Sequence, residues 1–312
     1  MTLSDPICYS INSISMGDVL AAAPIVKWAI DRFHKDGRYK VLAIPQYRDI
    51  FDFVPDSHFG DQRGKHTFQN TWQIRYLNTP RSANARTTSM RMHLSEFASI
   101  QLTDRIIPEE ERRYLPLPTV EIGHFGLDPR ECVFIIVTYR DETRRIPFET
   151  VLEISEYVVA RGLKPVYIGR EDDDPMWKDN PFRLSFDKLP DCGVSLLNKT
   201  SMLEMASLFR DARCVVGMDS GPIHVAGTTG GKVPIVCGFT TVAPEHRIPL
   251  RERGLFISVV PESLPCRHCQ SHWMLSYHNF GTCYFGHMLC VKRGMTGEAF
   301  VKALRQVFLK KE

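Results

Sequence analysis

The densest group of side chains that could do chemistry lies where an apolar strand pattern gives way to a helical one. Residues 215–226 read Val-Val-Gly-Met-Asp-Ser-Gly-Pro-Ile-His-Val-Ala. In an open parallel sheet, ligands bind at the carboxyl ends of strands, and the free N–H groups at a helix start suit a diphosphate. The pattern therefore predicts a phosphate site, and its candidate residues are Asp219, Ser220, Gly221 and His224. The alternative is an ordinary helix cap beside a satisfied histidine.

Hydroxyl and cationic side chains follow another strand pattern, at residues 133–137. The stretch 138–145 reads Thr-Tyr-Arg-Asp-Glu-Thr-Arg-Arg. An arginine can bind two phosphate oxygens at once and stabilise the charge that develops on a leaving diphosphate. Thr138, Arg140 and Arg144 are therefore candidate diphosphate ligands. The alternative is a solvated charged turn.

A carboxylate opens the first helical pattern of the chain. An apolar stretch at residues 7–11 is followed by a serine-rich turn, after which Gly17 and Asp18 begin a helical pattern that runs to about Phe33. The positive end of a helix dipole keeps a carboxylate in this position ionised. Taken alone, Asp18 fits an ordinary helix cap as well as a functional carboxylate.

Four cysteines form a late cluster. Cys266 and Cys269 have the spacing of a zinc knuckle, whereas Cys283 and Cys290 stand further apart. The pattern leaves two interpretations open, a structural zinc site and reduced thiols that pack without a metal.

The segments around Asp18 and Asp219 resemble glycosyltransferase family 9, the heptosyltransferases of lipopolysaccharide core synthesis. That family reads Asp-Ser/Thr-Gly-x-x-His where this chain has residues 219–224. Residues 13–20, Ser-Ile-Ser-Met-Gly-Asp-Val-Leu, resemble its N-terminal motif, and Gly-Phe-Thr at residues 238–240 follows in the family's order. The resemblance implies the α/β GT-B fold, in which two Rossmann-like, doubly wound domains face a central cleft. It also implies an inverting transfer from an ADP-sugar, heptose-like in its sugar, without a catalytic metal.

The resemblance assigns further roles. It makes Asp18 the general base that deprotonates the acceptor hydroxyl and places Gly17 on the acceptor side. On the donor side it places Thr240, and it makes Glu171 the carboxylate that binds the donor ribose. The chain departs from the family around Arg144, where a lysine and a threonine-rich turn are usual. The acidic run that begins at Glu171 has a divalent-ion site as its alternative.

The alternation of strand and helix patterns predicts two domains, at residues 1–122 and 123–295. Proline and glycine are so dense at residues 115–130 that no long element crosses this stretch, which we interpret as the linker. Beyond it we expect strands at 133–137, 165–168, 214–216 and 234–237, with helices at 148–160, 201–209 and near 223–228. An amphipathic helix at 297–309 ends the chain; whether segment 296–312 returns to the first domain is left open.

The acceptor side is inferred from charge. From Gln62 to Ser95 the chain has no acidic residue but six basic ones, with aromatic residues between them. Such a stretch in a chain of net charge +3 is a local anion footprint, and we take Arg81, Arg86 and Arg91 as acceptor ligands. The acceptor is then an anionic glycan or glycolipid such as a lipopolysaccharide core, with a modified nucleic-acid base as the alternative. A flexible basic loop without a ligand is the third interpretation.

Composition narrows the remaining classes. No apolar run approaches the ~18–20 residues that a membrane span needs. The N-terminus does not have the pattern of a secretory signal, and nine cysteines would leave one unpaired in an oxidising compartment. We therefore expect a cytoplasmic enzyme with peripheral membrane contact left open. A nucleotide-sugar epimerase or a non-catalytic nucleotide-sugar-binding protein with the same fold remains the alternative.

Overall fold

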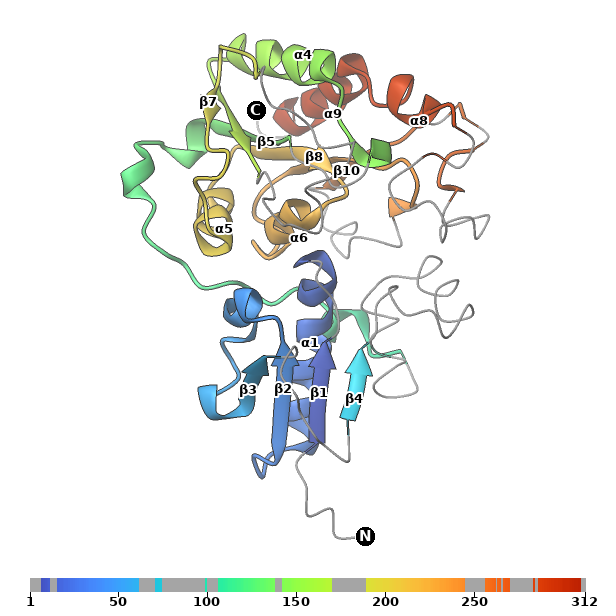
Figure 1. The fold of residues 1–312 in the computed structure, drawn as a ribbon. Coiled ribbons are helices and arrows are strands. Elements are labelled where there is room, and N and C mark those ends of the chain that lie inside the picture. Colours follow the sequence, from blue (N-terminus) through green and yellow to red (C-terminus); the bar gives the residue numbers. More distant parts are fainter. Residues whose placement is uncertain are drawn as a thin grey trace. The chain divides into compact units, whose positions relative to one another are not determined.

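A computed structural model describes most of the chain, which falls into two compact units (Figure 1). Unit 1 comprises Met1–Pro118 and Glu245–Pro249, and unit 2 comprises Thr119–Pro244 and Leu250–Glu312. The residues described are 7–11, 16–61, 71–74, 99, 106–137, 142–169, 189–244, 256–261, 263–264, 266–269, 283 and 286–309, with backbone alone at 71–74 and 142. Each unit has its own parallel sheet.

Unit 1 has a four-stranded parallel sheet in the order β3-β2-β1-β4. Its strands are β1 (Ile7–Ile11), β2 (Tyr39–Ala43), β3 (Phe59–Asp61) and β4 (Thr71–Ile74). Helix α1 (Met16–Phe33) crosses from β1 to β2 and buries its alanine-rich middle. The sequence predicted β1 with these bounds and the end of α1, but did not assign β3 or β4. Short 3₁₀ turns η1 (Pro45–Phe51), η2 (Asp56–His58) and η3 (Glu109–Glu111) complete the described part of the unit.

A buried polar contact joins the first strand of unit 1 to the end of its helix. The hydroxyl of Tyr9 and Nε2 of His34 are 2.7 Å apart. Burial lowers the pKa of His34 and raises that of Tyr9, so both groups are held in their neutral forms. The bond therefore satisfies two groups that would otherwise be buried without a partner.

Unit 2 has a six-stranded parallel sheet in the order β10-β9-β8-β5-β6-β7. Its strands are β5 (Cys132–Ile136), β6 (Lys164–Ile168), β7 (Val194–Ser195), β8 (Cys214–Met218), β9 (Ile235–Gly238) and β10 (Phe256–Val259). Its helices are α4 (Phe148–Val159), α5 (Met202–Arg210), α6 (Gly221–Gly227), α8 (Leu289–Lys292) and α9 (Gly297–Leu309). The four strands predicted for this unit are confirmed to within two residues.

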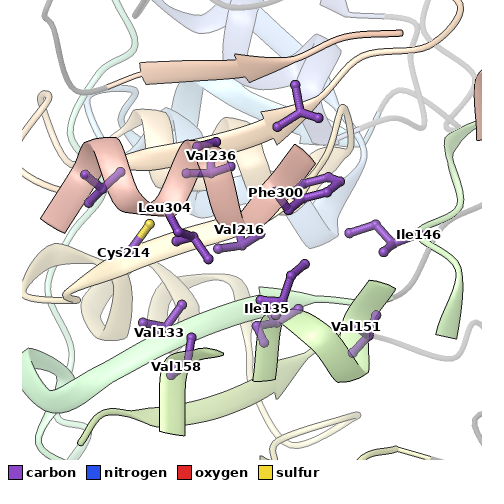
Figure 2. Packing of buried hydrophobic residues seen from close by; sticks show 14 of the residues in the cluster. Val133, Ile135, Ile146, Val151, Val158, Cys214, Val216, Val236, Phe300 and Leu304 are labelled. Atoms are coloured by element: carbon purple, nitrogen blue, oxygen red, sulfur yellow. The ribbon is translucent and has the colours of Figure 1, made fainter. Parts of the chain in front are cut away.

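The central strands of unit 2 are buried on both faces, which makes the sheet doubly wound. Alternate strand residues such as Val133, Ile135 and Val216 pack with α4 and with Phe300 and Leu304 of α9 (Figure 2). On the other face, Phe134 meets Phe209 of α5 edge to face, with ring centroids 5.4 Å apart. Period-2 alternation cannot be seen in such strands because both faces need apolar residues.

The C-terminal helix belongs to the core of unit 2. Phe300, Leu304 and Phe308 of α9 are buried, and the Phe308 ring stacks on Tyr157 of α4. The sequence had left open a return of this segment to unit 1. The structure instead places the apolar stripe of α9 against α4 and the sheet, where it is removed from water.

The linker is held to unit 2 by polar contacts with α5. The stretch 115–130 contains only single 3₁₀ turns, η4 (Gly123–Phe125) and the start of η5 (Pro129–Glu131). The N–H of Val120 donates to Oγ of Ser207 at 2.9 Å, and Arg210 donates to the hydroxyl of Thr119. These contacts explain why unit 2 begins at Thr119, inside the predicted linker.

No helix in the described part of the chain is long and apolar enough to cross a membrane.

Candidate functional site

Three neighbouring strands of unit 2 end at one edge of the sheet, and chemically capable residues follow each. The turn η6 (Glu142–Arg144) comes after β5, Asp219 and Ser220 follow β8, and Thr240 follows β9. Strand β8 lies between β5 and β9, and the N–H of Asp219 donates to the carbonyl of Gly238 at 3.1 Å. Parallel pairing therefore brings the residues after all three strands together.

A buried charge cluster is the centre of this edge. Nη1 of Arg144 donates to the carbonyl of Asp219 at 3.3 Å and lies 3.6 Å from its Oδ2. Nε2 of His224 lies 3.5 Å from Oδ1 of the same carboxylate. The side chains of Asp219 and His224 are only 5% and 4% exposed, whereas that of Arg144 is 15% exposed. Asp219 thus holds the other two, and Arg144 is the member that reaches solvent.

The start of α6 leaves a polar atom for a ligand to satisfy. Ser220 is the residue before the helix, but its hydroxyl makes no capping bond. Among the residues that the structure describes, its buried Oγ has no hydrogen-bond partner. Such an atom in a native fold calls for an explanation, and an oxygen-rich anion beside Arg144 would supply one. The structure thus brings Arg144 and His224 to Asp219, which precedes Ser220 and Gly221 in the chain. The donor-binding role of these residues stays a prediction.

Thr240 is near this cluster but its hydroxyl is already engaged. The side chain is 3% exposed, and Oγ1 donates to the carbonyl of Thr143 at 2.5 Å. This bond ties the turn after β9 to the turn after β5. The sequence did not predict a role for Thr143, because Thr143 contributes a backbone carbonyl, which no residue pattern reports.

The thiol of Cys237, near the end of β9, is also buried close to Asp219. Burial raises the pKa of Cys237 well above its usual range, and the charge of Asp219 raises it further.

The late cysteines lie together in unit 2. Burial raises the pKa of Cys290 to about 12, and the charges of Cys283, Cys269 and Cys266 raise it as well. The ring of His287 lies between two sulfurs, with Nε2 3.9 Å from Cys266 Sγ and Nδ1 3.9 Å from Cys283 Sγ. Within the described part of the chain, no three His, Cys, Asp or Glu side chains are arranged to hold a metal. The thiols are therefore grouped around the His287 ring.

The remaining predicted residues fall into two sets. Asp18 is half-buried and Gly17 is buried, both in the first turn of α1 in unit 1. The others lie outside the described residues, so their roles stay predictions; they are Thr138, Arg140, Glu171, Arg81, Arg86 and Arg91.

We predict that Arg144→Met lowers the free energy of unfolding by about 3 kcal/mol, because it leaves the Asp219 carboxylate buried with less compensation. Urea denaturation followed by circular dichroism measures the change. Arg130→Met is the matched control, since the ion pair of Arg130 with Asp128 is exposed and should contribute little. Equal effects of the two substitutions would show that the Asp219 cluster does not depend on Arg144.

Comparison with known sequences supports a family for this region. Residues 129–275 match the model of glycosyltransferase family 9 (heptosyltransferase). Lipooligosaccharide heptosyltransferase 2 of Haemophilus influenzae is 23% identical over 121 residues, which are 39% of this chain and 34% of that protein. The alignment thus spans about a third of that curated relative.

Solved structures match almost the whole chain. The iron-containing dodecameric glycosyltransferase TibC of enterotoxigenic E. coli has a TM-score of 0.74 at 18% identity, with 99% of this chain and 77% of TibC covered. Its complex with ADP-D-β-D-heptose has a TM-score of 0.69 at 17% identity, with the same coverage. ADP-heptose lipopolysaccharide heptosyltransferase II of E. coli has 0.57 at 13%, over 98% of this chain and 99% of that one. At these identities the likeness is one of fold. Residues 129–275 are thus similar to glycosyltransferase family 9, and the chain has the GT-B fold of the heptosyltransferases that it matches in structure.

Proposed function

We propose that this protein transfers a heptose-like sugar from an ADP-sugar to a hydroxyl of an anionic glycan or glycolipid. The observation that carries the proposal is the strand-end cluster of unit 2, where Arg144 pairs with Asp219. The next residue in the chain is Ser220, whose buried hydroxyl has no hydrogen-bond partner among the described residues. This cluster falls inside the family match at residues 129–275. The TibC structure with ADP-D-β-D-heptose supports the same class of donor.

The donor diphosphate would be recognised by charge and by fixed hydroxyl groups. The Arg144 guanidinium, which Asp219 orients, supplies positive charge to the leaving diphosphate. The Ser220 hydroxyl donates to a phosphate oxygen, and Thr138 and Arg140, which precede Arg144 in the sequence, add further contacts. Glu171 accepts hydrogen bonds from the ribose. In this proposal arginine, rather than a divalent ion, neutralises the charge that develops on the leaving group.

Asp18 of unit 1 would act as the general base. Its place in the first turn of α1 favours the ionised carboxylate. The acceptor oxygen attacks the anomeric carbon as its proton passes to Asp18, and the bond from that carbon to the diphosphate oxygen breaks. A single displacement of this kind inverts the configuration at the anomeric carbon.

We predict that Asp18→Asn lowers the rate of transfer by a factor of about 10²–10⁴, the usual contribution of a general base. Calorimetry should show that ADP binds this variant as it binds the wild type, because the donor contacts lie in unit 2. Asp31→Asn, on the same helix but in an exposed pair with Lys27, serves as control and should retain full activity.

Two results would count against the proposal separately. A transfer rate for Asp18→Asn within tenfold of the wild type would remove Asp18 from the role of base. If neither ADP nor an ADP-sugar raised the melting temperature of the wild-type protein, the donor assignment itself would fail, since a ligand of the native state stabilises it.

The acceptor proposal predicts a salt effect. If Arg81, Arg86 and Arg91 bind phosphates or carboxylates, the half-saturating concentration of acceptor should rise with salt, because a Debye length of about 8–10 Å screens exposed charges. Changing all three to glutamine should raise that concentration and flatten its salt dependence, with ADP affinity nearly unaltered. Glutamine at the exposed Arg38, Arg113 and Arg130 is the control. A nucleic-acid acceptor would give the steepest slope, and an unchanged triple variant would refute the assignment.

We also propose a structural metal ion held by Cys266, Cys269, Cys283 and Cys290. Four thiolates are a donor set that suits tetrahedral zinc or iron, and the sulfurs of Cys266 and Cys283 each lie 3.9 Å from the same His287 ring. TibC is described as iron-containing, whereas the knuckle spacing favours zinc. The ion would hold the loop together and take no part in the transfer.

We predict about one zinc or iron per chain by elemental analysis of protein purified without chelators. Cys269→Ser should reduce this content sharply. Cys192→Ser is the control because Cys192 is a free, exposed cysteine elsewhere in unit 2. A wild-type protein that stays metal-free when refolded with either ion would leave the thiols as packing residues only.

A further inference from the structure

Three arginines of unit 2 surround one stacked pair of aromatic rings. Tyr157, near the end of α4, stacks on Phe308, near the end of α9, with ring centroids 6.2 Å apart. The guanidinium carbons of Arg161 and Arg305 lie 5.2 Å and 6.0 Å from the centroid of the Tyr157 ring. That of Arg213 lies 5.7 Å from the centroid of the Phe308 ring. We call these five residues the arginine cluster.

The arginine cluster lies at the opposite edge of the sheet from the strand-end cluster. Arg213 directly precedes β8, and its backbone N–H donates at 3.0 Å to the carbonyl of Cys132, the first residue of β5. Asp219 directly follows the same strand β8. At about 3.3 Å per strand residue, the two positions are roughly 20 Å apart. The arginine cluster is therefore separate from the proposed donor site.

The positive charges of the cluster have no carboxylate partner. Within the described part of the chain, no ion pair includes Arg161, Arg213 or Arg305, although the nearby Lys164 pairs with Glu131 at 3.4 Å. Like charges held close together repel one another, and a cation on a solvent-exposed ring is stabilised only modestly. The negative end of α4 attracts Arg161, but Arg213 stands before a strand. Local packing thus does not account for three guanidinium groups here.

Two buried polar atoms of the cluster also have no partner. Oη of Tyr157 and Nε of Arg213 are hidden from solvent and form no hydrogen bond with any residue that the structure describes. Both atoms carry a hydrogen to donate, and a buried donor without an acceptor is destabilising. An anion with several oxygens would accept from both and would balance the charge. The exposed side chains of Arg161 and Arg305 give it a route from solvent.

We propose that the arginine cluster is a second ligand site of unit 2 and that it binds a phosphate group. A tetrahedral phosphate accepts hydrogen bonds from several directions, and a guanidinium fork matches a pair of its oxygens. A carboxylate, by contrast, is paired by a single arginine. In the occupied site the arginines and the Tyr157 hydroxyl donate to phosphate oxygens, while the stacked rings hold the guanidinium groups in place. A small phosphorylated molecule and a lipid headgroup share this chemistry.

The first test measures the affinity for inorganic phosphate. Phosphate is titrated into the full chain by calorimetry at constant ionic strength, with ADP present throughout to occupy the proposed donor site. R305Q removes one fork from an exposed position and should weaken phosphate binding by about 10–100-fold, the range of a hydrogen bond to a charged group. R130Q is the matched control, because Arg130 is exposed in unit 2 and already paired with Asp128; it should bind phosphate as the wild type does.

Y157F separates a ligand site from simple packing. It keeps the ring stack and removes only the unpartnered hydroxyl. Without phosphate, Y157F should be at least as resistant to urea as the wild type, because no hydrogen bond is lost. With phosphate, its melting temperature should rise less than that of the wild type, since a more weakly bound ligand stabilises less. Y167F is the control: the Tyr167 hydroxyl donates to Ser155 at 3.0 Å, so it should lose stability in both conditions and bind phosphate normally.

Two further probes distinguish the sources of the phosphate. Glycerol phosphate represents a soluble ligand, and vesicles of phosphatidylcholine with and without phosphatidylglycerol represent a membrane. Binding of glycerol phosphate without a preference for the anionic vesicles identifies a soluble ligand. Cosedimentation with the anionic vesicles that R305Q abolishes and R130Q retains identifies a headgroup. Either result supports the site.

Other results would overturn the site. Equal phosphate affinity in the wild type, R305Q and Y157F would do so, as would a lack of binding to all of these probes. A loss of stability of Y157F in the absence of phosphate would show that the hydroxyl already serves the fold. None of these measurements depends on the proposed transfer reaction, so the site stands or falls apart from it.

Discussion

The carboxylate of Asp219 is the group on which the strand-end cluster of unit 2 depends. It is buried at the edge of a sheet whose central strands are apolar on both faces. An ion in such a place costs several kcal/mol of desolvation unless it is paired and hydrogen-bonded. Arg144 and His224 provide this compensation from the turn after β5 and from α6. Satisfying one charge therefore fixes the relative positions of three segments.

The packing below the cluster restricts which residues can build it. A Cβ on Gly217 would lie 3.0 Å from Cβ of Ile136, and one on Gly238 would lie 3.1 Å from the Phe300 ring. Both distances are tighter than ordinary van der Waals contact. Glycine at these positions lets β8 and β9 approach their neighbours closely. The C-terminal helix, through Phe300, is thus part of the support of the site as well as of the core.

The proposed chemistry divides between the units. The family match covers residues 129–275, which include the proposed donor-side residues and the first two of the four late cysteines, Cys266 and Cys269. Asp18 and the basic stretch from Gln62 to Ser95 lie outside that match, in unit 1. A donor diphosphate presents the same charges whatever sugar it carries, so fixed arginine and hydroxyl groups are sufficient to bind it. In the proposed function, the acceptor is recognised by its own shape and charge through residues of unit 1, so these are the assignments that the substitutions above test.

Local patterns in the sequence determined which segments become strands and helices and placed the polar residues at their junctions. Strand β1, the end of α1 and helix α9 follow from apolar periodicity, and residues 219–224 follow from the change from an apolar strand to small residues. Strands β7 and β10, the two edge strands of the sheet, were not predicted. The reason is length: β7 has two residues, and β10 has four, too few for its apolar Phe256, Ile257 and Val259 to show a clear period. The tertiary structure alone decided that Thr240 donates to Thr143, which is 97 residues away along the chain. That contact forms because β5 and β9 lie on either side of β8, so that the segments after them meet at one edge of the sheet. The order of the strands is set by packing across the whole unit rather than by any local run of residues.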